Sequence, residues 1–153
     1  MLAVVLVVCA ALSGCALSIP SDPEGTLDAV RGRILHVGAS PNGDAVRVEG
    51  GIVSGAEAQL VERFADHLDA EVDWTVGAEE ALVRALERGE LQLVVGGLTD
   101  ATPWADRSGV TRPYAEVRDA VGETHKLVML VPMGENAFLS ELEVFLSQEV
   151  RAR

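Results

Sequence analysis

A run of small and polar residues ends a strongly apolar segment in the middle of the chain. The segment reads LQLVVGGLTDATPW, and its last part carries Gly97, Thr99 and Trp104. Paired glycines let the main chain turn sharply, so that its N–H groups and a threonine hydroxyl could donate hydrogen bonds to a small molecule. An indole ring nearby offers a stacking or cation–π surface. The same residues also suit a tight strand exit with local turn hydrogen bonds and a packed indole, so both interpretations stay open.

Other chemistry-bearing residues lack the spacing that catalysis or metal binding requires. The histidines His36, His67 and His125 are far apart in the sequence, and no pattern places a nucleophile beside a base. Glu79 and Glu80 are adjacent at an expected helix start, where acidic side chains favour the helix dipole. No lysine follows GGLTD at the spacing of a phosphate loop. We therefore expect no enzyme activity, no catalytic residue, no metal site and no cofactor.

The N-terminus has the features of an export signal. The stretch MLAVVLVVCAALSGCALSIPSDPEG begins with an uncharged apolar run and then becomes polar. Ser13 and Gly14 interrupt this run before it reaches the roughly 20 apolar residues of a spanning helix. LSGC, which ends at Cys15, resembles the bacterial lipobox, whose cysteine is lipidated and becomes the first residue after cleavage. No Lys or Arg precedes Arg31, which departs from such signals, and an uncleaved anchor and a buried strand are the alternatives.

The lipobox resemblance divides the chain into three parts. We expect residues 1–14 to be a signal peptide, residues 15–31 a lipidated tether, and residues 32–149 one folded domain. The acyl chains on Cys15 would anchor the protein firmly, because each buried methylene contributes about 0.8 kcal/mol. The expected location is therefore the cell membrane, with the lipid-anchored domain facing the periplasm or the cell exterior.

Composition indicates one acidic domain with an aliphatic core. Of the 153 residues, 48% are hydrophobic and only 4% are aromatic, so valine, leucine and alanine must fill the core. The net charge of −12 and the absence of a basic stripe in the sequence disfavour nucleic acid as a partner.

Hydrophobic periodicity predicts strands that alternate with helices. Short apolar runs indicate strands, and apolar residues three and four positions apart indicate helices. The expected elements are strand 32–40, helix 54–70, strand 71–77, helix 78–89, strand 91–99, strand 127–131 and helix 135–150. This order favours a parallel sheet with helices on its faces.

Local signals refine these elements. Asn42-Gly43 predicts the turn of a loose hairpin over 41–51. Ser54 and Glu57 have the spacing of a capping box at the start of one helix. Asn136 is the expected N-cap of the last helix. Residues 115–124 are polar and show no pattern.

Several of these stretches, taken in order, resemble one lobe of a known family. GAEAQLVERFADHLDAEVDW, ALVRALERGELQLVVGGLT and VTRPY are similar to the G-x-(E/D)-x-x-L helix, the helix-to-strand join and the F-S-x-P-Y end of the family 3 extracellular solute-binding proteins, the polar amino-acid receptors of ABC importers. Residues 125–149 resemble the strand and helix that return to the same lobe. The resemblance implies an α/β fold: a single three-layer lobe of the type 2 periplasmic binding protein fold, with a mostly parallel sheet and helices on both faces.

The resemblance also implies where a ligand would bind. In the family, the lobe-one site uses the glycine and threonine of a G-x-T turn, which Gly97 and Thr99 match. The arginine that clamps the ligand carboxylate follows five residues later, and Trp104 stands at that position. Ser40 stands where the family has an acidic residue, and Glu79 where an aromatic often stacks. The implied ligand-binding edge is thus Ser40, Gly97, Thr99 and Trp104. It lacks the hydrogen-bonded arginine–carboxylate pair, a contact worth about 1.5–3 kcal/mol.

The second lobe of the family has no counterpart here. Only residues 115–124 lie between the P-Y end and the returning strand, and ten residues span at most about 35 Å. We therefore expect a lipoprotein resembling the substrate-binding component of an ABC transporter, which weakly binds a small polar or cationic solute such as an amino acid. The alternative is a non-transport interaction or sensor lipoprotein that uses the exposed lobe face. Expected partners are the solute, the membrane, and either an ABC permease or a second copy of the chain.

Overall fold

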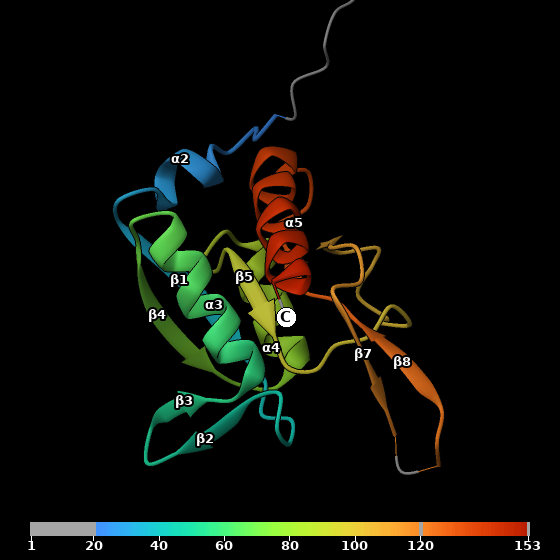
Figure 1. Ribbon diagram of the computed structural model, residues 1–153. Coiled ribbons are helices and arrows are strands. Elements are labelled where there is room, and N and C mark those ends of the chain that lie inside the picture. Colours follow the sequence, from blue (N-terminus) through green and yellow to red (C-terminus); the bar gives the residue numbers. More distant parts are fainter. Residues whose placement is uncertain (1–20, 120, 153) are drawn as a thin grey trace, which may run out of the picture.

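The computed structural model describes residues 21–119 and 121–152 (Figure 1). The expected signal peptide and Cys15 lie outside these residues. Within the described part, no helix combines the length and the apolar character needed to cross a membrane.

A five-stranded mixed sheet forms the centre of the fold, in the order β4-β1-β5-β9-β6. Strand β1 (Ile34–Ala39) lies between β4 (Glu71–Val76) and β5 (Leu93–Val95) and is parallel to both. Strand β9 (Leu130–Val131) is antiparallel to β5 and to β6 (Gly109–Val110). The returning strand therefore lies beside the earlier three strands, as the resemblance implied.

Helices cover both faces of this sheet. Helices α3 (Ala56–His67) and α5 (Asn136–Arg151) lie on one face, and α4 (Glu79–Glu87) lies on the other (Figure 1). Phe64 of α3 meets Phe138 of α5 edge to face, with ring centroids 5.8 Å apart. The fold class expected from the sequence, a single α/β lobe with helices on both faces, is confirmed.

A short helix precedes the first strand. Helix α2 (Thr26–Val30) contacts α5. Asp22, just before α2, caps the N-terminus of α5. One carboxylate oxygen of Asp22 accepts hydrogen bonds from the N–H groups of Ala137 (2.7 Å) and Phe138 (2.9 Å). The expected cap at Asn136 was wrong, because Asn136 is the first helical residue and no side chain of its own turn caps the helix. Part of the segment assigned to the tether is therefore packed against the domain.

The hairpin expected over 41–51 was misplaced, because the strands that pair lie further along the chain. Strands β2 (Arg47–Glu49) and β3 (Ile52–Ser54) pair antiparallel and are joined by Gly50-Gly51. Both glycines have positive φ, 58° and 83°, as the favoured two-residue hairpin turn requires. The chain does turn at Asn42-Gly43, where Asn42 and Val46 form an isolated antiparallel bridge, but this turn precedes β2 and does not join the two strands.

A second hairpin occupies the stretch that was expected to be unpatterned. Strands β7 (Ala115–Arg118) and β8 (Thr124–Leu127) pair antiparallel and project from the body of the fold (Figure 1). Sequence analysis missed it because β7 alternates Ala115 and Val117 with Glu116 and Arg118, a weak pattern in so short a strand. The β7–β8 hairpin thus connects β6 with β9.

Candidate functional site

The Gly96-Gly97 turn lies at the carboxyl end of β5, next to the end of β1. The N–H of Ser40 donates to the C=O of Val95 (2.9 Å), and the Asn42 side-chain amide donates to the C=O of Gly96 (2.9 Å). A Cβ built on Gly96 would lie only 2.7 Å from the Cβ of Ser40, and Gly97 has a φ of 65°. Two glycines are therefore needed here, one for close approach and one for conformation.

A buried carboxylate holds this turn. One oxygen of Glu57 accepts hydrogen bonds from the N–H groups of Gly96 (2.9 Å) and Gly97 (2.8 Å), and the other accepts from the Tyr114 hydroxyl. Glu57 is 1% exposed and Tyr114 is 7% exposed. The N–H of Gly97 is therefore committed to Glu57 and is not available to a ligand at this edge.

The environment of Glu57 shifts its proton affinity. Burial raises the pKa of the Glu57 carboxyl, and the three hydrogen bonds that it accepts oppose this shift. Burial and the nearby Glu57 charge raise the pKa of the Tyr114 phenol as well.

The expected capping box was wrong, because Gly55 rather than Ser54 precedes α3 and no side-chain cap forms. Glu57 reaches across to β5 instead.

The other predicted site residues lie further along the same loop. Thr99 is half-buried and forms a bridge with Leu127 at the end of β8. Trp104 is half-buried against the apolar cluster beneath α4. The indole N–H of Trp104 donates to the carboxylate of Glu79, at the start of α4, over 3.1 Å. The structure thus brings Ser40 to the glycine turn and Trp104 to Glu79, and it places Thr99 beside the hairpin.

The two arginines near the loop are paired elsewhere. Arg107 forms two hydrogen bonds to Glu87, of 2.8 and 2.5 Å, and its guanidinium carbon lies 5.6 Å from the Trp104 ring centroid. This pair lowers the pKa of the Glu87 carboxyl and raises that of Arg107. The Nε of Arg112 donates to Glu143 over 2.7 Å. Both guanidinium groups are therefore paired with carboxylates, and that of Arg107 also lies over the Trp104 ring of the predicted edge.

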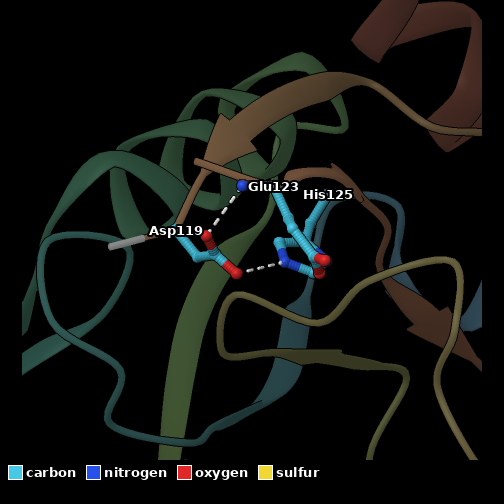
Figure 2. Close-up of side chains that lie close together, drawn as sticks. All are labelled: Asp119, Glu123 and His125. Carbon is cyan, nitrogen blue, oxygen red and sulfur yellow. Dashed lines mark hydrogen bonds and ion pairs between the residues drawn. The ribbon is translucent and has the colours of Figure 1, made fainter. Parts of the chain in front are cut away.

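A separate cluster at the tip of the β7–β8 hairpin contains groups that bind metals in other proteins. Ligand atoms of Asp119, Glu123 and His125 lie within 4.8 Å of one another (Figure 2). One oxygen of Asp119 accepts from the N–H groups of Val121 (3.0 Å) and Glu123 (2.9 Å), and the other lies 3.0 Å from Nε2 of His125. Both carboxylate oxygens therefore already accept hydrogen bonds that close the turn, and we assign the cluster that structural role.

Glu57, Asn42 and Glu79 are the residues of this region whose roles sequence reasoning missed. Glu57 was assigned to a helix cap, although an acidic residue on an otherwise apolar helix face was a signal of a buried partner. Asn42 was assigned to a turn, and no sequence signal connects it with Gly96. Glu79 was interpreted through its helix position alone, whereas Trp104 gives it a contact 25 residues away.

The fold has matches among solved structures, although the sequence matches no known family model. No protein-family model and no curated protein matches the sequence. Among solved structures, the arginine-bound form of domain 1 from TmArgBP shares 17% identity with a TM-score of 0.68, covering 84% of this chain and 99% of that chain. A chain from Wolinella succinogenes complexed with lysine shares 13% identity with a TM-score of 0.69, covering 80% and 92%.

A third similar structure connects the fold with an enzyme. The ancestral amino acid-binding protein AncCDT-1, a precursor of cyclohexadienyl dehydratase, shares 14% identity with a TM-score of 0.69, covering 82% of this chain and 94% of that chain. Identities this low establish the fold alone. The chain is a single α/β lobe with the fold of periplasmic binding proteins, and its structural neighbours include the first domain of an arginine-binding protein.

Proposed function

We propose that the chain is the solute-binding component of an ABC transporter and holds a small cationic solute at the edge formed by Ser40, Gly97, Thr99 and Trp104. The observation that carries this proposal is the match to domain 1 from TmArgBP, which is a single domain and is arginine-bound. A lobe of this fold can therefore hold a ligand without a second lobe to close on it.

The polar groups of this edge favour a cation. The carboxylate of Glu79 accepts the indole N–H of Trp104, and the N–H of Gly97 is committed to Glu57, so this N–H is not available to an anion. The Glu79 carboxylate would attract an ammonium or guanidinium group, just as the Trp104 indole already has the guanidinium carbon of Arg107 5.6 Å from its ring centroid. An anionic group would lack a guanidinium clamp, because Arg107 and Arg112 are paired with other carboxylates. We therefore place the ligand's cationic group, not its carboxylate, at this edge.

Binding rather than catalysis fits the buried carboxyl of the region. Glu57 is 1% exposed and accepts three hydrogen bonds, from Gly96, Gly97 and Tyr114. A general base must come within hydrogen-bond reach of the substrate proton. Glu57 cannot do this while it holds the turn, so we assign it a positioning role.

A comparison of three ligands in a thermal-shift assay tests this proposal. Agmatine is arginine without its carboxylate, and citrulline keeps the carboxylate but has no cationic side chain. We expect agmatine to raise the Tm at least as much as arginine does. With a Kd of about 1 mM and a ligand concentration of about 10 mM, the expected rise is about 4 °C. Citrulline should have no effect. Failure of all three to raise the Tm, or an equal effect of citrulline and arginine, would contradict the proposal.

The proposed location outside the cytoplasm depends on lipidation of Cys15. Its support is the LSGC sequence, where small residues precede the cysteine. We expect labelled palmitate to enter the full chain and the Cys9→Ser variant, but not the Cys15→Ser variant. Equal labelling of all three chains would show that the lipid is attached elsewhere, and no labelling of the full chain would remove the anchor.

A further inference from the structure

The main chain of β7 is paired on one side only. The N–H of Asp119 donates across the hairpin to the C=O of Glu123 over 3.0 Å, and antiparallel strands repeat such bonds at every second residue. Because Val117 is opposite His125 in this register, Val117 bonds to β8. Glu116, one position earlier, must direct its N–H and C=O to the outer edge of β7.

The outer edge of β8 is engaged, in contrast. The C=O of Lys126 points away from β7 and accepts a hydrogen bond from the N–H of Asp100 over 2.9 Å, as the same alternation requires. Thr99 also forms a bridge with Leu127. Among the described residues, no main-chain group pairs with Glu116 on the outer side of β7. The hairpin therefore presents one open strand edge.

An apolar groove of about 310 Å³ runs beside this edge, between β7 and the ends of α3 and α5. Its apolar walls come from Leu60 of α3, from Leu146 and Val150 of α5, and from Val117 and Leu127 of the hairpin. Val117 is 42% exposed and Val150 is 53% exposed, so the groove is open to solvent. A strand laid along β7 would cover these side chains.

Charge around the groove restricts what can enter it. The charged residues of its lining are carboxylates, among them Asp44, Glu116 and Glu149. Asp44 pairs with Arg47 (2.7 Å) and Glu149 with Arg63 (2.9 Å), so these two are locally neutralised. No lysine, arginine or histidine lies among the described lining residues, and an acidic ligand would find no partner there.

We propose that this groove binds an extended peptide segment of another protein, uncharged or basic and with apolar side chains at alternate positions. The segment adds as a strand to the outer edge of β7, where the main chain of Glu116 supplies one donor and one acceptor. Its alternate side chains pack on Leu60, Leu146 and Val150. The groove and the solute edge are lined by different residues, so either site can fail without the other.

The test uses the blocked peptide acetyl-Lys-Val-Thr-Val-Thr-Val-Lys-amide and the full chain, with binding followed by amide NMR shifts. We expect the Glu116 amide to shift and to exchange more slowly with solvent when the peptide is bound. Two further peptides carry N-methyl groups, one on the valines and one on the threonines. Strand addition uses only one of these two sets of amides, so only one methylated peptide should lose binding. Equal binding of both would overturn the proposal.

Two pairs of variants separate strand addition from loss of the fold. Glu116→Pro removes only the outward N–H, which a proline on an edge strand tolerates, and Thr124→Pro does the same on β8. Val150→Lys places a charge in the groove, and Val144→Lys places one elsewhere on α5, where Val144 is 51% exposed. We expect about tenfold weaker binding in the first variant of each pair and no change in the second.

A second copy of the chain is the competing occupant of the same edge. Sedimentation of the full chain and of the Glu116→Pro variant distinguishes the two. A monomer that binds the peptide supports the proposal. A dimer that Glu116→Pro converts into monomer would overturn it in favour of self-association, and so would the absence of any Glu116 shift at millimolar peptide.

Discussion

Two turns in this molecule are held by the same hydrogen-bond arrangement in opposite environments. At the sheet edge, Glu57 accepts two main-chain N–H bonds with one oxygen and a side-chain O–H with the other. At the hairpin tip, Asp119 accepts two main-chain N–H bonds with one oxygen and lies 3.0 Å from His125 with the other. Glu57 is buried, whereas Asp119 is exposed.

For these two carboxyl groups, the difference in burial rather than in the number of hydrogen bonds accounts for the opposite directions of the pKa shifts. Desolvation outweighs three hydrogen bonds and raises the pKa of Glu57. With little desolvation, the hydrogen bond from His125 dominates and lowers the pKa of Asp119. The contribution of Glu57 to the free energy of unfolding therefore depends on pH. The turn that Glu57 holds forms part of the candidate solute edge. The exposed turn only closes a ribbon.

Replacement of Glu57 should have the largest effect on this comparison. Glu57→Ala leaves the N–H groups of Gly96 and Gly97 and the Tyr114 hydroxyl without a partner in the interior. We expect the free energy of unfolding to fall by about 3 kcal/mol in urea titrations, because each buried orphan group costs about 1–3 kcal/mol. The matched control is Glu62→Ala, at an exposed position of the same helix. Similar losses in both variants would show that the buried carboxylate does not hold the turn.

Removal of one hydroxyl should have a smaller effect of the same kind. Tyr114→Phe keeps the packing of the ring but takes one hydrogen bond from Glu57. We expect a loss of about 1–2 kcal/mol in the free energy of unfolding. The pKa of Glu57 should rise further, because this hydrogen bond lowers it. Unchanged stability of the Phe variant would indicate that the hydroxyl does not stabilise the buried carboxylate.

The pH dependence of stability should differ between the two turns. Because the folded-state pKa of Glu57 is raised above its ordinary value of 4.5, the folded chain binds a proton that the unfolded chain has lost. The contribution of Glu57 is therefore greatest below about pH 4.5 and declines as the pH rises through the folded pKa. Glu57→Gln should remove this decline from a series of urea titrations. A variant with the same pH profile as the unmodified chain would assign the decline to other groups.

Changes at the hairpin tip should have the smallest effect. The hydrogen bond to Asp119 raises the pKa of His125 above 6.5, so its contribution is present at low pH and is lost as the pH rises through the folded pKa. Asp119 contributes above its ordinary value of 3.8, and this is lost as the pH falls through its lowered pKa. We expect Asp119→Asn to lower the pKa of His125 in an NMR titration and to change the Tm by at most about 3 °C. A larger decrease in Tm would contradict this prediction and show that the hairpin tip contributes substantially to the stability of the fold.

The fold could be predicted largely because its strands and helices have clear periodicity. The apolar runs that form β1 and β5 and the helical stripe through Phe64 gave these elements, and their order gave the sheet. What could not be predicted depends on contacts between distant residues. Asp22 caps a helix 115 residues away, and Glu57 reaches Gly96 over 39 positions. No local pattern contains such pairs, so the nearby residues Asn136 and Ser54 were assigned as caps instead.

The candidate site shows the same limit. The sequence indicated the glycine turn and Trp104, and the structure shows their surroundings: Ser40 against Gly96, and Trp104 hydrogen-bonded to Glu79. The sequence could not show that the Gly97 N–H is committed to Glu57, which removes a main-chain donor from this edge. The ligand expected at this edge is for that reason a cation.

The most direct test of this account is an NMR titration of the full chain with agmatine. We predict that the indole N–H of Trp104 and the amides of Gly97 and Thr99 shift together and saturate at about millimolar agmatine, while the Asp119 and Glu123 amides of the hairpin tip do not move. Agmatine at about 10 mM that leaves the Trp104 and Gly97 signals unchanged would contradict the central claim that this single lobe binds a cationic solute at the sheet edge.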